Sequence, residues 1–151
     1  MTDTPTQLRA LAGEMDDVAG QVRELSGELL GVRDDLAWRS VAATEYRESL
    51  GERAATSARS ADLVDDLAHS LRRHAESVEQ VQAAIATARS FLLGALEDAR
   101  MVLADLWDGL IDSITPGVEH AERIIAISAQ TPGSDTDPAW LDLARAAGWR
   151  G

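Results

Sequence analysis

Apolar residues in the first part of the chain recur at alternating intervals of three and four. The series fills consecutive a and d positions of a heptad repeat: Leu8, Leu11, Met15, Val18, Val22, Leu25, Leu29, Val32 and Leu36. Such spacing places one apolar stripe along an α-helix. Thr4 and Pro5 provide an N-cap and a first-turn proline, so the pattern predicts a helix over about residues 5–37.

Three glycines lie seven residues apart in this helix, at the f position of the heptad. They are Gly13, Gly20 and Gly27, and each follows a small residue at the e position. Glycine costs about 1 kcal/mol relative to alanine inside a helix. One interpretation is a smooth strip on which a second helix, from this chain or from a partner, packs closely. The other is an outward-facing position that tolerates glycine; the repeated small pairs favour the packing strip.

A second long helix is predicted after a turn at residues 37–41. Ser40 is a suitable N-cap, and no proline follows until Pro116, so the helix is expected over about residues 41–114. Its alanine-rich start indicates close approach to the first helix. If the helix is not continuous, Gly94 is the point at which it would break.

Further along this helix, the three-four spacing returns as an apolar seam. Its members include Leu71, Val78, Val81, Ile85 and Leu92. We expect the seam to mediate self-association or partner binding, because monomers rarely leave so long a stripe uncovered. The alternative is an intramolecular cover by the C-terminal residues, which contain Ile124, Ile125, Trp140 and Trp149.

The C-terminal part predicts two short helices. The first covers about residues 118–129, and the second starts after Asp137, has Pro138 in its first turn and ends near Gly148. The expected fold class is all-α, a long antiparallel helical hairpin with a C-terminal helical extension that assembles as a bundle or coiled coil. The expected parts are a hairpin over residues 1–90, a continuation of the second helix over 91–115, and the short helices over 116–151.

Composition narrows the range of functions. The 151 residues carry a formal charge of −12, which repels phosphate and anionic lipid and argues against nucleic-acid or membrane-surface binding. No stretch has the roughly 20 apolar residues of a membrane span, and the first residues do not resemble a secretory signal. The absence of cysteine excludes disulfides and thiolate metal sites. All 14 basic residues are arginine, which is typical of a GC-rich genome.

Candidate chemistry is sparse. His69 and His74 are five residues apart, which is not the spacing of a helical zinc pair, and His120 is expected on the surface. Acidic pairs such as Asp16-Asp17 are read as solvated helix faces. No phosphate loop, nucleophile elbow or catalytic triad is present. We therefore expect a protein that is not an enzyme and uses no metal or cofactor.

Trp38 stands at the end of the first apolar stripe, beside the predicted turn. An indole there can close the end of the hairpin core while its N–H reaches water. We favour this structural cap. The alternative is an exposed ring that anchors another protein.

The turn carries a family resemblance. A helix followed by Trp38-Arg39-Ser40, small residues, Tyr46-Arg47 and Leu50 resembles the WXG family of type VII (ESX-like) secretion proteins, with serine in place of the turn glycine. The resemblance covers about residues 5–90. It implies a helical hairpin that pairs with a second hairpin into a four-helix bundle, as a homodimer or as a heterodimer with a related protein. By carry-over, Trp38 and Ser40 belong to the turn that helps to form a recognition surface.

Membership would further imply an actinobacterial protein that serves a secretion ATPase or contacts it, cytoplasmic or exported without a classical leader. The family's export signal, Tyr-x-x-x-Asp/Glu after the second helix, is missing, because the sole tyrosine is Tyr46 and Leu50 stands four residues later. A partner would then have to supply the signal. The alternative function is a cytoplasmic helical chaperone or scaffold for a toxin or another neighbouring gene product, not itself exported.

Overall fold

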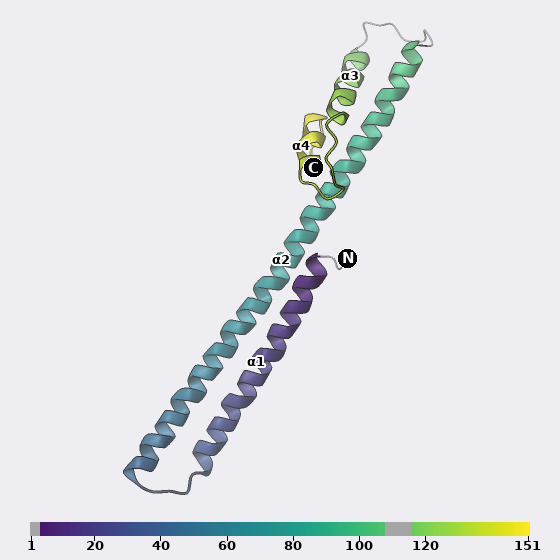
Figure 1. Ribbon diagram of the computed structural model, residues 1–151. Helices are drawn as coiled ribbons and strands as arrows, with labels where there is room; N and C mark the ends of the chain where they lie inside the picture. Colours follow the sequence, from purple (N-terminus) through teal and green to yellow (C-terminus); the bar gives the residue numbers. More distant parts are fainter. Residues whose placement is uncertain (1–3, 108–115) are drawn as a thin grey trace. The chain divides into compact units, whose positions relative to one another are not determined.

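The computed structural model describes residues 4–107 and 116–151 of the chain. These residues form four helices and no strand: α1 (Thr4–Asp35), α2 (Val41–Trp107), α3 (Pro116–Ser128) and α4 (Ala139–Ala146) (Figure 1). The predicted all-α fold is confirmed. The helices divide between two compact units, Met1–Val78 and Glu79–Gly151.

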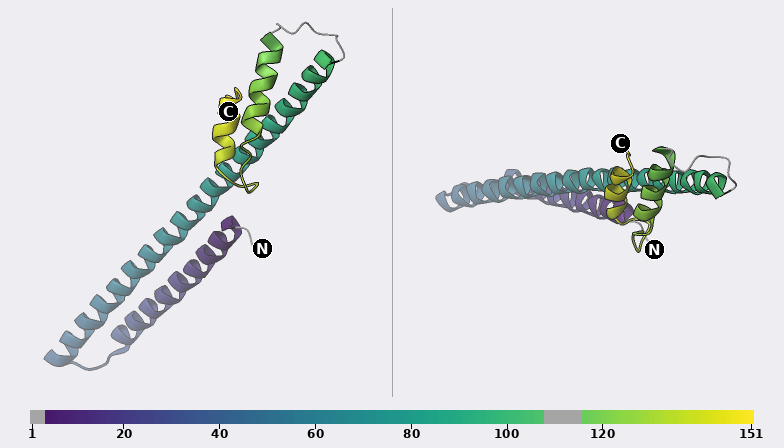
Figure 2. Two further views of the ribbon diagram at one scale, coloured as in Figure 1. Left: turned by 45° about the horizontal axis from the view of Figure 1, so that its top comes forward. Right: turned by 90° about the horizontal axis from the view of Figure 1, so that it is seen from above.

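In unit 1, α1 packs antiparallel against the first part of α2, as both views of Figure 2 show. The contact line consists of small residues. On α1 these are Ala12, Ala19 and Ser26, and on α2 they are chiefly Ala43, Ala54, Ala61, Ala68 and Ala75. Most are seven residues apart and almost wholly buried, so the two backbones can approach closely along the contact. The hydroxyl of Ser26 donates a 2.8 Å hydrogen bond to the carbonyl oxygen of Ala54 and is thereby satisfied inside the contact.

The e position, not the glycine position, therefore contacts α2. A Cβ atom added at Gly13, Gly20 or Gly27 would meet no other side chain or neighbouring helix within 4 Å. As an intramolecular packing strip, the glycine prediction is wrong, and the packing of a partner helix on these glycines stays a prediction. The reason is geometric: successive helix positions are separated by about 100°, so the f position turns away when e faces α2.

The hairpin unit ends at Val78, earlier than the expected residue 90. α1 has 32 residues and can cover only a similar length of α2. The helix α2 itself continues without a break through Gly94 to Trp107. Residues 108–115, including the predicted end of this helix, lie outside the described residues.

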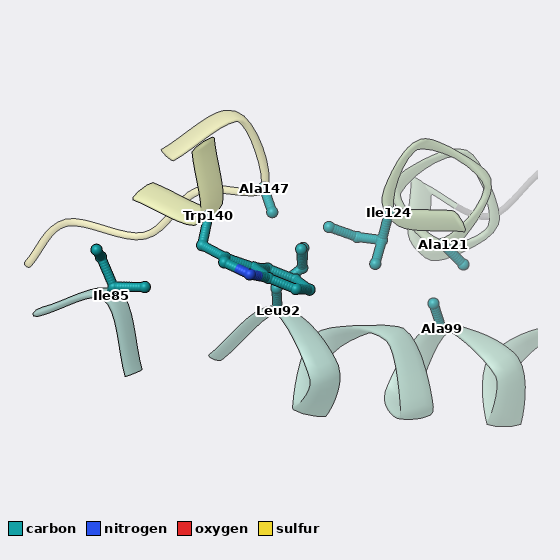
Figure 3. Packing of buried hydrophobic residues seen from close by; sticks show 7 residues of the cluster. All are labelled: Ile85, Leu92, Ala99, Ala121, Ile124, Trp140 and Ala147. Carbon is teal, nitrogen blue, oxygen red and sulfur yellow. The ribbon is translucent and has the colours of Figure 1, made fainter. Parts of the chain in front are cut away.

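Unit 2 contains the later part of α2 together with α3 and α4. Its buried cluster consists of Ile85, Leu92, Ala99, Ala121, Ile124, Trp140 and Ala147. Figure 3 shows the Trp140 ring lying over Leu92, with Ile124 beside it. The intramolecular cover is confirmed for Ile124 and Trp140, while Ile125 packs at the edge of the cluster and Trp149 is half-buried.

This cover changes the interpretation of the seam predicted on α2. Ile85 and Leu92 are 2% and 1% exposed, so they are core residues of unit 2 and cannot face a partner while this unit is folded. Leu71 and Val78 are half-buried in unit 1, and Val81 is exposed. The seam is therefore not one uniform association surface.

Local hydrogen bonds hold α4 against the core of unit 2. The Asp137 carboxylate accepts a 2.9 Å hydrogen bond from the Ala139 amide, and the Trp140 indole N–H donates to the Ser134 carbonyl at 2.9 Å. After α4, Gly148 adopts a φ of +103°, and the Trp149 amide donates back to the Ala144 carbonyl. Glycine adopts this conformation without a steric penalty, which explains the end of the helix at the predicted place.

Candidate interaction surfaces

The turn between α1 and α2 is held by Ser40. Its hydroxyl accepts a 3.1 Å hydrogen bond from the amide of Ala43, and its carbonyl oxygen accepts a 3.0 Å bond from the amide of Thr44. These bonds satisfy amides that would otherwise lack a partner at the start of a helix. The predicted N-cap role of Ser40 is confirmed, and it gives a physical reason for serine at the third position of Trp38-Arg39-Ser40.

Arg47 holds the turn from the second turn of α2. Its guanidinium donates hydrogen bonds to the carbonyl oxygens of Leu36 and Trp38, which no helix bond satisfies. Arg47 was expected only as part of the family pattern, and its hydrogen bonds to the turn were not predicted from the sequence. The available signal was its place after the N-cap, from which a long arginine side chain can reach back to the preceding loop.

Replacing Ser40 by alanine should lower the free energy of unfolding by about 1 kcal/mol, because an amide at the start of α2 loses its acceptor. Ser40→Gly should cost only about a few tenths of a kcal/mol, because glycine is itself well tolerated at the N-cap position. Urea unfolding followed by circular dichroism measures both changes. Ser70→Ala, an exposed mid-helix substitution, serves as the control and should leave stability nearly unchanged. A Ser40→Ala protein as stable as the parent would contradict the capping role.

The side chain of Trp38 is not a cap over the hairpin core. It is 71% exposed, so the favoured structural interpretation is wrong, and the alternative role of anchoring another protein stays a prediction. Arg39 and Tyr46 are exposed as well, while Leu50 is buried at 6% exposure and belongs to the α1–α2 contact. The predicted turn residues therefore separate into exposed groups around Trp38 and structural groups at Ser40 and Leu50.

A second exposed apolar surface runs along α1. The d-position residues Leu11, Val18, Leu25 and Val32 are 40–51% exposed, and the a-position residues between them are mostly half-buried. They follow one side of the contact line with α2. We call this surface the α1 apolar face and define it by the a and d residues from Leu8 to Val32.

α2 borders the same face. A groove is lined by Leu25 and Leu29 of α1 and by Arg53, Ser57 and neighbouring residues of α2. Leu67 lies two heptads after Arg53, so it occupies the same side of α2, and it is 50% exposed. At this groove the α2 border of the α1 apolar face is therefore polar, with Glu52, Arg53, Thr56 and Ser57, and Leu67 is an exposed apolar residue further along the same side.

Comparisons of the chain with protein-family models, with curated proteins and with solved structures find no match. The chemistry of its own surfaces must therefore carry any functional argument.

The other side of the α1–α2 contact is closed by ion pairs. Arg72 of α2 bonds to Asp16 of α1, and Arg23 of α1 bonds to Asp65 and, at 3.0 Å, to Asp62. The hydrogen bond from Arg23 lowers the pKa of Asp65 below its usual value. This carboxylate therefore favours the folded hairpin above its ordinary pKa, and the effect is lost as the pH falls through the lowered pKa. The hairpin has one charged side and one apolar side.

Neither a metal centre nor a membrane span is found in the described parts of the chain. No group of three or more histidine, aspartate or glutamate residues there is placed to hold a metal ion. None of the helices in the same residues combines the length and the apolarity that crossing a bilayer needs.

Proposed function

We propose that this chain is a non-enzymatic helical adaptor or substrate of a type VII, ESX-like secretion system, and that it works by pairing with another helical protein. The α1 apolar face carries the proposal. Four d-position side chains along it are 40–51% exposed. The resemblance of residues 38–50 to the WXG turn supports the connection to secretion.

Pairing through this face has a direct physical basis. Full burial of a leucine, valine or methionine side chain stabilises a complex by about 1.5–3 kcal/mol relative to full exposure. The side chains of this face are half-exposed, so burial by a partner would supply part of that free energy. A second hairpin laid on the face would complete a four-helix bundle with knobs-into-holes packing. Trp38, at the end of the hairpin, would then insert into the partner as an aromatic anchor.

Changing Leu11, Val18 and Leu25 together to serine should weaken pairing about a hundredfold, because three partly exposed side chains lose their apolar contact with the partner. Analytical ultracentrifugation of the chain with its co-purified partner measures the affinity. The control changes Leu93, Met101 and Trp107 to serine, which are exposed apolar residues of unit 2 and not of α1. Pairing that survives the first triple change, or is lost equally with the control, would contradict the proposal.

The second candidate, a cytoplasmic chaperone or scaffold, is favoured by one observation. Tyr46 is the sole tyrosine and is followed at the fourth position by Leu50, so the export pattern does not occur in these 151 residues. Immunodetection in culture supernatant, with and without an intact type VII ATPase gene, separates the candidates. ATPase-dependent release supports the adaptor or substrate. Retention in the cell in both strains, with the partner bound, supports the chaperone.

A further inference from the structure

The outer flank of the α1 apolar face has a regular charge pattern. One flank of the face is the small-residue contact line with α2. The opposite flank is the g position of the heptad, and its residues are Gln7, Glu14, Gln21, Glu28 and Asp35. All five are exposed, and none is basic. In coiled coils, side chains at this position meet the neighbouring helix across the seam and set the choice of partner.

Charged residues on one side of α1 form ion pairs with α2, and those on the other side do not. Beside the contact with α2, Asp16 and Arg23 form ion pairs with residues of α2. On the outer flank, Glu14, Glu28 and Asp35 make no side-chain hydrogen bond or ion pair with any residue that the structure describes. The unmatched carboxylates thus run alongside the exposed apolar stripe, where an arriving helix would lie.

We propose that the partner helix on the α1 apolar face is amphipathic and carries lysine or arginine at seven-residue intervals, opposite Glu14, Glu28 and Asp35. This deepens the proposed function, on which it rests, by naming the chemistry of the partner. An apolar seam supplies the affinity, and the basic residues fix the register and exclude acidic helices.

A second copy of this chain does not offer such a helix. Its α1 would bring the same carboxylates and repel them. Its α2 presents only uncharged residues at the positions equivalent to g, counted from the α2 contact line: Ser49, Thr56, Leu63, Ser70 and Ser77. The charge pattern therefore selects a different polypeptide as the partner.

Two synthetic peptides of about four heptads test this, both with leucine and isoleucine at a and d. One carries lysine at the flanking positions and the other glutamate. The full chain should bind the lysine peptide more tightly. The triple variant E14R/E28R/D35R should bind the lysine peptide about tenfold more weakly, as expected for three exposed charge pairs, and should prefer the glutamate peptide. Fluorescence anisotropy at low and high salt measures both.

The matched control is D17R/E24R/E48R, which changes the net charge equally at exposed positions off this flank. It should keep the preference for the lysine peptide and most of its affinity. An equal loss in both triple variants would show attraction by overall charge and overturn the proposal, as would equal binding of the two peptides or a stable homodimer through the α1 apolar face.

The basic-helix inference and the proposed function fail in different experiments. If the serine changes at Leu11, Val18 and Leu25 abolish pairing with the natural partner while the arginine changes do nothing, the pairing role stands and the basic-helix inference fails. If the lysine peptide binds as expected but release into the culture supernatant does not depend on the secretion ATPase, the secretion role fails and the basic-helix inference stands.

Discussion

Replacing Trp140 by alanine should lower the free energy of unfolding of unit 2 by about 3–5 kcal/mol, the usual range for removing a buried aromatic side chain. Trp140 is 4% exposed and belongs to the same buried cluster as Leu92 and Ile124. The change also removes the indole N–H bond to Ser134 and the contact with Arg89, whose guanidinium carbon lies 5.8 Å from the ring centroid. Arg89 in turn pairs with Asp135 at 3.0 Å, so one substitution disturbs several contacts that hold the C-terminal segment to α2.

Native-state hydrogen exchange measures this effect by residue. Amides of α3, α4 and the later part of α2 should lose protection, and those of the hairpin should keep it. Trp107→Ala is the matched control, because that ring is 88% exposed and its removal should change stability little. Unaltered protection in α3 and α4 after loss of Trp140 would mean that the indole is not central to this core.

The hairpin should be equally sensitive to added volume. Changing both Ala54 and Ala68 to leucine should lower its stability by about 2–6 kcal/mol, since overpacking a tight contact costs roughly 1–3 kcal/mol at each site. Both alanines are at most 1% exposed and lie on the contact line with α1. They are two heptads apart on one helix, so the two effects should nearly add.

Thermal unfolding followed by circular dichroism checks this prediction. The control changes the exposed alanines Ala10 and Ala55 to leucine, and Ala55 is the immediate neighbour of Ala54. Leucine and alanine are both strong helix formers, so the control should stay close to the parent. A stable double variant at Ala54 and Ala68 would show that the helices do not meet along this line.

From the sequence, the helices could be located and the alanine-rich start of α2 assigned to the contact with α1, but the α1 residues of that contact could not be identified. The three-four spacing, the capping residue Ser40 and the long stretch without proline are local signals, and each depends only on neighbours in the chain. The contact line is not local. In the sequence alone, an alanine on the contact line cannot be told from an alanine that faces solvent, because the difference depends on where the second helix lies.

The same limit explains Trp38 and the seam on α2. Both an end cap and an exposed anchor fit a tryptophan beside a turn, and only the position of the surrounding helices leaves the ring exposed. Ile85 and Leu92 were predicted on an association surface because their periodicity shows that something covers them. It does not show whether the cover is another protein or, as in this chain, Ile124 and Trp140 of the C-terminal segment.

By itself, the sequence determined that the chain is helical and where the long helices begin. It also determined that both long helices carry apolar stripes, which other helices must cover if they are to be buried. Those properties follow from local capping, propensity and spacing. The tertiary structure decided which seam is covered from within the chain and which is left exposed. Alanines on both helices allow close backbone contact at the e position, and this packing leaves the larger a and d side chains half-exposed beside a line of unmatched carboxylates.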